Sequence, residues 1–271
     1  MIAEGHDVYG CDNLIGGDVN NVPKKAHFYK ADCSNLHTMN ILLYDVDIVY
    51  HTACTAYEGL SVFSPTTICQ NTFQITAATL TAAIRNEVKR FVYCSSMARY
   101  GNQPFPFIEE MPTLPEDPYA IAKVASEKLI KVLCETHEME YVIAVPHNII
   151  GPRQKCDDPF RNVAAIMINL MLQGRQPIIY GDGEQKRCFS FISDCISCLT
   201  KMGFANVSGE TINIGPDEEF VTINELAKVI AKIIGFNLKP IYFPERPREV
   251  KLSTCSLLTF LHIRRVRCMD L

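Results

Sequence analysis

Short apolar runs alternate with helical patterns along this 271-residue chain, and that alternation constrains its fold more than any other feature. The apolar runs have the length of strands and are bounded by turn residues, while the segments between them carry helical spacing. A strand, helix, strand order needs crossover connections, which produce a parallel sheet covered by helices. The predicted strands are residues 6–11, 26–30, 47–51, 90–94 and 141–146, and the predicted long helices are residues 68–86 and 118–136. The sequence predicts a doubly wound α/β domain over residues 1–150.

The pattern changes after Gly151-Pro152-Arg153, where the predicted elements become shorter. Helices are predicted at residues 160–174 and 224–235, and strands at residues 176–180 and 211–214. We therefore expect residues 151–271 to form mainly a smaller α/β lobe that binds substrate.

Tyr119 and Lys123 are separated by four residues and follow Pro118, which favours the first turn of a helix. Positions i and i+4 share a helix face, so the ammonium of Lys123 is expected near the phenol of Tyr119 and should lower the pKa of that phenol. A Tyr-x-x-x-Lys spacing also arises by chance. The context of this pair strengthens the functional interpretation, because Ser96 follows the apolar strand at residues 90–94 and open α/β sheets carry their sites at the carboxyl ends of strands. These three residues predict a centre for proton and hydride transfer.

Acidic residues follow the first two predicted strands. Asp12 and Asn13 directly follow the strand at residues 6–11, and Asp32 follows the strand at residues 26–30. A carboxylate at this place can bind the hydroxyls of an adenosine ribose, while Asp-Asn before two glycines equally suits a turn. Both interpretations of Asp12 and Asn13 stay open. The small residues after the strand at residues 47–51 would let either a flat ligand approach the backbone or a helix pack closely against the strand.

Composition argues against several classes of function. The chain is 48% hydrophobic with a net charge of −4, so neither nucleic acid nor an anionic membrane is expected as a partner. No apolar stretch reaches the ~18 residues of a membrane span and no signal-peptide pattern opens the chain, which favours the cytoplasm. The twelve cysteines are scattered, mostly in apolar runs, and are expected to be reduced and buried. The dispersed histidines predict no metal site, and His51 is expected to be a satisfied core or loop residue.

Several motifs in a fixed order resemble those of extended short-chain dehydrogenases/reductases of the NAD-dependent epimerase/dehydratase family, close to UDP-glucose 4-epimerases. The resemblance covers residues 1 to about 250. It rests on Asp12-Asn13-Leu14, His51-Thr52-Ala53-Cys54, Asn71, Ser95-Ser96-Met97-Ala98-Arg99-Tyr100-Gly101, Tyr119 with Lys123, Pro146-His147-Asn148-Ile149-Ile150-Gly151-Pro152-Arg153, Tyr180-Gly181-Asp182-Gly183-Glu184-Gln185-Lys186-Arg187 and Arg246-Pro247-Arg248-Glu249-Val250.

The resemblance implies a Rossmann-type fold, NAD as cofactor and a nucleotide sugar, UDP-linked, as substrate. It implies that Tyr119 is the base, that Lys123 tunes it, and that Ser96 contacts the reacting hydroxyl. The implied cofactor-binding residues are Asp12, Asn13, Asp32, Cys33, Thr52, Ala53, Cys54, Asn71, Tyr119, Lys123 and Pro146. The implied substrate-binding residues are Ser96, Asn148, Arg187 and Arg246, the two arginines clamping the diphosphate. Relatives of this kind also form homodimers through their long helices.

The resemblance further implies epimerisation through a transient keto-sugar. Family dehydratases carry Asp-Glu directly after the catalytic hydroxyl, and family decarboxylases carry a glutamate near this point, whereas this chain has Met97 and Ala98. Two alternatives stay open. One is a non-catalytic or impaired dinucleotide-binding relative, and the other is a nucleotide-sugar dehydratase or reductase.

One family feature does not occur in the sequence. The family opens with a strand and a Gly-x-x-Gly-x-x-Gly turn that cradles the pyrophosphate, whereas residues 1–6 resemble the end of the first helix with Gly5 as its C-terminal cap. We therefore expect a sheet that lacks its first strand, weak NAD binding and impaired activity.

Overall fold

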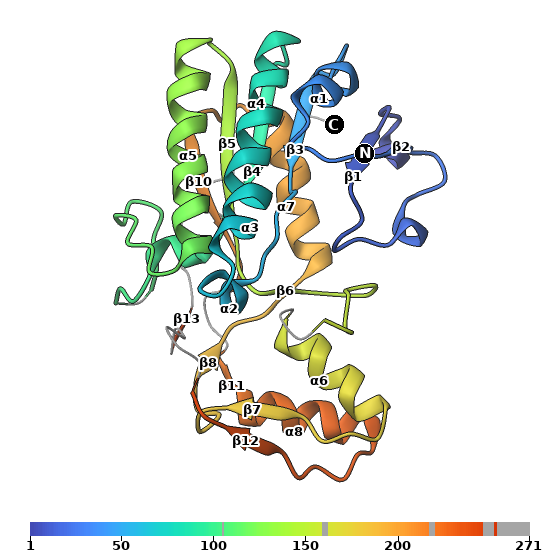
Figure 1. The fold of residues 1–271 in the computed structure, drawn as a ribbon, viewed down its shortest axis with the longest axis vertical. Helices are drawn as coiled ribbons and strands as arrows, with labels where there is room; N and C mark the ends of the chain where they lie inside the picture. The colour runs from blue at the N-terminus through green and yellow to red at the C-terminus, as the bar shows by residue number, and fades with distance from the viewer. Residues whose placement is uncertain (105, 159–161, 217–219, 246–251, 254–271) are drawn as a thin grey trace.

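A computed structural model describes residues 1–104, 106–158, 162–216, 220–245 and 252–253. Its centre is a parallel sheet of β3 (Ile48–His51), β4 (Arg90–Cys94), β5 (Glu140–Pro146) and β10 (Glu210–Ile214), in the order β10-β5-β4-β3 (Figure 1). The predicted strand at residues 90–94 is confirmed at both ends. The predicted parallel α/β architecture is confirmed as well.

Two N-terminal strands form a separate sheet. β1 (Tyr9–Asp12) pairs in parallel with β2 (His27–Lys30), and both lie beyond β3 in Figure 1. Within the described residues, β1 and β3 are not hydrogen-bonded to each other, so each has one edge without a ladder partner. A short 3₁₀-helix, η1 (Ile2–Glu4), precedes β1 and ends at Gly5 with φ +88°, which confirms the predicted cap.

Helices cover both faces of the central sheet (Figure 1). α4 (Ile75–Arg85) and α5 (Pro118–Thr136) pack on one face, and α7 (Ile192–Phe204) packs against β4 and β5 on the other. α5 begins where Asp117 accepts a hydrogen bond from the backbone N–H of Ala120 and Pro118 takes the first turn. α4 continues α3 (Pro65–Cys69) through a π-helical turn, η3 (Gln70–Gln74). The other helices of residues 1–136 are α1 (Leu36–Leu42), α2 (Glu58–Ser61), η2 (Val19–Asn21) and η4 (Met97–Tyr100).

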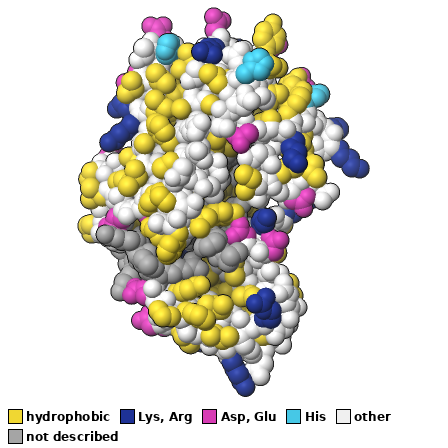
Figure 2. Space-filling model, viewed as in Figure 1, with side chains coloured by type: hydrophobic (Ala, Val, Ile, Leu, Met, Phe, Trp, Pro, Cys, Tyr) yellow, Lys and Arg dark blue, Asp and Glu magenta, His cyan; other side chains and the backbone are white. Residues whose placement is uncertain are grey.

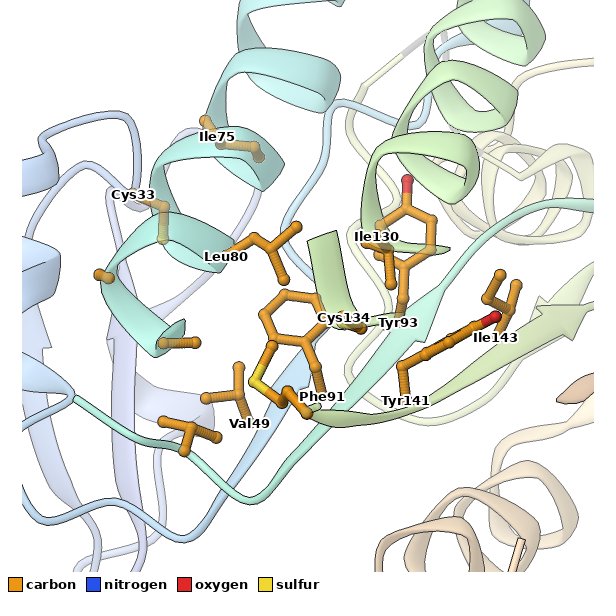
Figure 3. Packing of buried hydrophobic residues seen from close by; sticks show 14 of the residues in the cluster. Cys33, Val49, Ile75, Leu80, Phe91, Tyr93, Ile130, Cys134, Tyr141 and Ile143 are labelled. Carbon is orange, nitrogen blue, oxygen red and sulfur yellow. The ribbon is translucent and has the colours of Figure 1, made fainter. Parts of the chain in front are cut away.

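The core is built on both faces of β4, as expected for a central parallel strand. Phe91 and Tyr93 pack with Leu80 and Ile130 under the α4 and α5 face (Figure 3), while Val92 belongs to the cluster under α7. Burying an aliphatic or aromatic side chain of this size contributes roughly 1.5–3 kcal/mol. The carboxyl ends of β4 and β5 are therefore held firmly.

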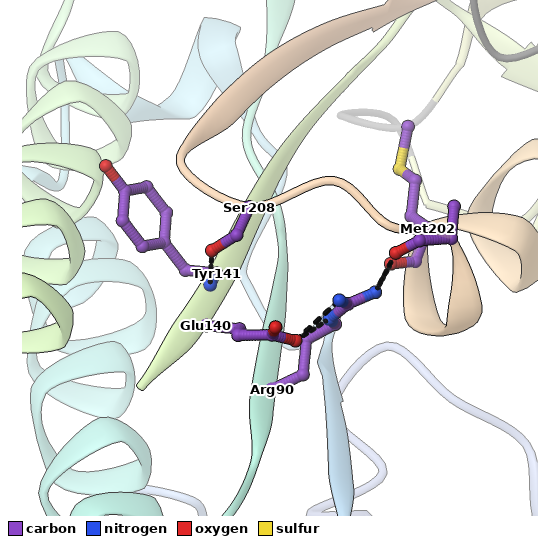
Figure 4. A network of polar contacts seen from close by, with 6 residues as sticks. Arg90, Glu140, Tyr141, Met202 and Ser208 are labelled. Atoms are coloured by element: carbon purple, nitrogen blue, oxygen red, sulfur yellow. Dashed lines mark hydrogen bonds and ion pairs between the residues drawn. The ribbon is translucent and has the colours of Figure 1, made fainter. Parts of the chain in front are cut away.

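A polar network fixes the end of α7 to the sheet (Figure 4). The guanidinium of Arg90 donates to the carbonyl oxygens of Met202 at 3.0 Å and Ala205 at 2.6 Å, and its Nε donates to Glu140 Oε2 at 2.8 Å. Beside it, the hydroxyl oxygen of Ser208 accepts a hydrogen bond from the backbone N–H of Tyr141 at 3.3 Å. Residues 192–214 thus return to the central sheet.

A smaller lobe lies below the carboxyl ends of the central strands (Figure 1). α6 (Val163–Leu172) and α8 (Ile223–Ile234) share a core with β7 (Ile178–Tyr180), which pairs with β12 (Ile241–Phe243). The linking strands are β6 (Ile149–Ile150), β8 (Lys186–Arg187), β9 (Ser190–Phe191), β11 (Val221–Thr222) and β13 (Leu252–Ser253). Figure 2 shows hydrophobic side chains on this lobe, where the side chains of β12 are about half exposed. The helices in the described ranges include none with the length and apolarity needed to cross a bilayer.

Candidate active site

A cleft of about 700 Å³ lies between the carboxyl ends of the central strands and the smaller lobe. Clefts of this size commonly bind small ligands. Its lining comes from the residues that follow β4, from α2, the start of α5, the end of β5 and the facing lobe. Five residues singled out from the sequence line it, namely Ser96, Tyr119, Pro146, Asn148 and Arg187.

The predicted trio of Ser96, Tyr119 and Lys123 converges at this cleft. Ser96 follows β4 and accepts a hydrogen bond from the backbone N–H of Ala98 at 3.2 Å, so it caps η4. Tyr119 lies in the first turn of α5 and lines the same cleft as Ser96. Lys123 lies behind Tyr119, with its Nζ 5.9 Å from the Tyr119 ring centre and 2.6 Å from the carbonyl oxygen of Cys94, to which it donates.

The protonation of Tyr119 differs from the sequence-based expectation. Burial raises the pKa of Tyr119 well above its ordinary value, and the charge of Lys123 offsets that rise only in part. Burial alone would lower the pKa of Lys123, but the acidic groups of Cys54, Tyr93 and Tyr119 raise it well above its ordinary value. Lys123 is therefore an ammonium, and its charge opposes the effect of burial on Tyr119.

A buried ion pair beneath the trio was not predicted from the sequence. Glu127 lies one helical turn beyond Lys123, and its Oε2 is 3.1 Å from the guanidinium of Arg99. Its Oε1 accepts a hydrogen bond from the hydroxyl of Ser95. Burial raises the pKa of Glu127, although Arg99 acts in the opposite direction. The only sequence signal was the spacing of four residues from Lys123, which places Glu127 on the same helix face.

Asp12, Asn13 and Asp32 meet where β1 and β2 end. Asp12 Oδ1 accepts from the backbone N–H of Leu14 at 2.6 Å, and Asn13 Nδ2 donates to Asp32 Oδ2 at 3.5 Å. Hydrogen bonds from Ser34 lower the pKa of Asp32. The turn interpretation of Asp12 and Asn13 therefore holds, and Asn13 links this turn to Asp32. A β-carbon in place of Gly17 Hα would lie 3.0 Å from Asp12 Oδ2, so glycine keeps that oxygen accessible.

The segment between these two groups lies after β3. Thr52, Ala53 and Cys54 form an irregular stretch, and Cys54 packs against the cluster that contains Tyr119. The backbone N–H of Thr55 donates to the carbonyl oxygen of Asn71 at 3.1 Å. Asn71 lies in the π-helical turn η3, a local geometry that is frequent at functional sites. This stretch connects the core beneath the turns of Asp12 and Asp32 to Tyr119.

The predicted diphosphate contacts lie on the opposite wall of the cleft. Asn148 has an unusual φ of +26°, and its side-chain amide donates to the carbonyl oxygen of Cys188 at 3.0 Å. Arg187, on β8, lines the cleft. Arg246 lies outside the described residues. A contact missed from the sequence also lies at this cleft, where the hydroxyl of Tyr57 donates to Asp158.

His51 and the cysteines of the described residues have structural surroundings that need no ligand. His51 is buried and pairs with the hydroxyl of Thr76 at 3.0 Å, which confirms its expected role as a satisfied core residue. All cysteines in the described ranges are free thiols, although five of the ten are not fully buried. Cys195 and Cys198 have Cys-x-x-Cys spacing but lie buried on α7, and no metal-binding cluster occurs in the part of the chain that the structure describes.

Comparison with known proteins identifies the family. Residues 1–215 match the model of the NAD dependent epimerase/dehydratase family. The chain belongs to this family. It is 32% identical over 254 residues to a putative UDP-glucose 4-epimerase of Methanocaldococcus jannaschii, which covers 92% of this chain and 81% of the relative.

Solved structures agree with this membership of the epimerase/dehydratase family. The UDP-glucose 4-epimerase of Thermotoga maritima, solved with UDP-glucose, superposes with a TM-score of 0.91 at 27% identity and covers 96% of this chain and 85% of its own. The UDP-glucose 4-epimerase of Thermus thermophilus, solved with NAD, has a TM-score of 0.91 at 25% identity and covers 96% and 86%. Relatives at 28% identity also include a UDP-N-acetyl-alpha-D-glucosaminuronate decarboxylase of Bacillus cytotoxicus and a dTDP-glucose 4,6-dehydratase of Streptomyces niveus.

NAD is the cofactor of this epimerase/dehydratase family, and the described residues fit its two ends. Asp12, with the space left at Gly17, suits the hydroxyls of the adenosine ribose. Lys123 has three N–H donors, of which the carbonyl of Cys94 takes one, so the ammonium can also reach a ribose hydroxyl at the nicotinamide end.

Proposed function

We propose that this chain is a nucleotide-sugar epimerase that inverts a sugar hydroxyl, UDP-hexose 4-epimerase-like, through a transient keto-sugar. The observation that carries the proposal is the convergence of Ser96 and Tyr119 on one cleft with the buried ammonium of Lys123 behind the tyrosine. This arrangement suits removal of a proton from a bound hydroxyl.

The protein's own groups would carry the proton. Tyr119, as phenolate, accepts the proton of the sugar hydroxyl and later returns it, while Ser96 hydrogen-bonds the same oxygen and orients it. Lys123 favours the phenolate by its charge. NAD, when bound, supplies the acceptor and donor of hydride. The residues proposed to hold it are Asp12, Asn13, Asp32, Cys33, Thr52, Ala53, Cys54, Asn71, Tyr119, Lys123 and Pro146.

Inversion additionally requires the keto-sugar to turn within the cleft while its nucleotide stays bound. Asn148 and Arg187 line the wall opposite Tyr119 and are proposed to hold the diphosphate, with Arg246 as a further clamp suggested by its motif. Arginine suits this role because its planar fork binds phosphate oxygens in pairs. A UDP-linked sugar is the proposed substrate.

The residues after Ser96 favour epimerisation over loss of water or carbon dioxide. Met97 lines the cleft, and Ala98 packs against the cluster that contains Tyr119. Neither can transfer a proton, whereas a dehydratase needs a further acid and base beside the substrate. Epimerisation requires only the trio and a reusable cofactor.

A non-catalytic dinucleotide-binding role is the second candidate. It is favoured by the separation of the β1–β2 sheet from β3 in the described residues. Such a protein would bind NAD or a nucleotide sugar without converting it.

We also propose a cytoplasmic homodimer. Ile121 and Val132 on α5 are 53% and 60% exposed, which gives the proposed interface helix apolar side chains to bury. Free thiols in the described residues suit a reducing compartment. Light scattering of the wild type and of Val132→Glu tests the dimer: a monomeric wild type contradicts it.

A panel of UDP-sugars incubated with the purified chain and NAD, followed by chromatographic separation of products, tests the function. We expect one sugar to reach equilibrium with its epimer without net consumption of NADH. A deoxy-keto product or carbon dioxide release would assign the chain to another branch of the family. Binding without conversion would support the non-catalytic candidate.

A further inference from the structure

Two cysteine thiols face each other at the adenosine end of the site. Cys11 lies on β1, and Cys33 lies in the turn after β2. The thiol of Cys33 donates a hydrogen bond to Cys11 Sγ, with the two sulfur atoms 3.9 Å apart. A disulfide requires about 2.05 Å, so the sulfur atoms need to approach each other by roughly 1.9 Å.

The two thiols have different reactivities. The hydrogen bond from Cys33 lowers the pKa of Cys11, although burial and the charge of Asp12 act in the opposite direction. The same hydrogen bond and burial raise the pKa of Cys33. Cys11 is only half-buried, whereas Cys33 belongs to the hydrophobic core (Figure 3). Cys11 is thus the reachable nucleophile, and Cys33 is the resolving thiol beside it.

We propose that Cys11 and Cys33 form an oxidisable dithiol that closes to a reversible disulfide on exposure to hydrogen peroxide and thereby weakens NAD binding. The thiolate of Cys11 attacks the peroxide, the O–O bond breaks, and Cys11 becomes a sulfenic acid while one oxygen leaves as water. Cys33 then attacks the sulfenic sulfur, and the second oxygen leaves as water. Two thiols are oxidised to one disulfide as one peroxide is reduced to two waters.

The coupling to NAD follows from the chain neighbours of the two cysteines. Cys11 directly precedes Asp12, and Cys33 directly follows Asp32. Both carboxylates are held by short turns, Asp12 through the backbone of Leu14 and Asp32 through Ser34 at 2.8 Å. Drawing the sulfur atoms together displaces these turns, because each cysteine is a direct chain neighbour of the aspartate that its turn holds.

Peptide mapping of the intact chain tests the proposal. The reduced protein is treated with one equivalent of hydrogen peroxide, free thiols are alkylated, and the digest is analysed by mass spectrometry with fragmentation. We expect a crosslink between Cys11 and Cys33 that dithiothreitol removes. It should be lost in Cys33→Ser and retained in Cys69→Ser, the matched control, because Cys69 is exposed and has no thiol neighbour in the described residues.

A second measurement follows NAD itself. Calorimetric titration should give a dissociation constant for NAD that rises roughly fivefold or more on oxidation of the wild type and is unchanged by peroxide in Cys33→Ser. Oxidation of Cys69 without the Cys11–Cys33 crosslink would overturn the proposal. A crosslink with unchanged NAD affinity would overturn its coupling to the cofactor. The mapping does not depend on turnover, so failure of the epimerase proposal and failure of this one remain distinguishable.

Discussion

Replacing Lys123 with methionine removes the positive charge behind Tyr119 and leaves a side chain of similar length. The Nζ lies 5.9 Å from the Tyr119 ring centre. At an effective dielectric constant of about 20, two unit charges at that separation interact by about 2.8 kcal/mol, which corresponds to roughly two pKa units. Because burial already raises the pKa of Tyr119, losing the ammonium raises it further.

Below the pKa of Tyr119, the fraction of phenolate falls tenfold for each pH unit. We therefore expect kcat of Lys123→Met to be about 100-fold lower near neutral pH, with the rise of log kcat shifted about two units towards alkaline pH. The assay is the pH profile of epimerisation, with circular dichroism to verify folding. Lys131→Met, exposed on the same helix, is the control. An unshifted profile in Lys123→Met would refute the electrostatic role of this lysine.

Three further changes test the packing around the site. Glu127→Ala leaves the guanidinium of Arg99 buried without its partner and should lower the free energy of unfolding by about 3–5 kcal/mol in urea titrations, whereas a loss below about 1 kcal/mol would show the pair to be unimportant. Burial lowers the pKa of both His51 and His147 to about 3, so unfolding takes up protons below pH ~6.5 and stability falls as the pH drops from there towards 3. Each histidine contributes about 1.4 kcal/mol per pH unit to this loss of stability. His147→Leu should remove one of the two contributions, and an unchanged slope of the free energy of unfolding between pH 7 and 5 would contradict it. Gly101→Ala should destabilise the chain by at least about 2 kcal/mol in the same titrations, because its φ is +59° and a β-carbon would lie 2.1 Å from a backbone carbonyl oxygen; near-wild-type stability would contradict this geometry.

The local order of the fold could be predicted from the sequence. The helix at Pro118–Thr136 was predicted with the bounds it has in the structure, because Asp117 and Pro118 give an unambiguous start. The spacing of Tyr119 and Lys123 correctly placed both on one face. Periodicity and capping are local properties, so a single sequence carries them.

The features that depend on long-range packing could not be predicted. The pKa of Tyr119 was expected to fall, but it rises because α2 and the stretch after β3 bury the phenol, as its contacts with Tyr57 and Cys54 show. The Arg99–Glu127 pair joins residues 28 positions apart, and the local sequence indicates only that Glu127 shares a helix face with Lys123, not that it pairs with Arg99. Burial and distant partners become known only when the chain is folded.

Conversion of UDP-glucose by the wild type and by Tyr119→Phe, followed by proton NMR of the sugar anomeric signals, tests the central claim most directly. The account predicts that the wild type interconverts UDP-glucose and UDP-galactose, or another UDP-hexose and its epimer, without net NADH, and that Tyr119→Phe retains NAD but loses turnover. Equal turnover by Tyr119→Phe would contradict the catalytic assignment. A wild type that retains NAD and converts no UDP-hexose would contradict the proposed function.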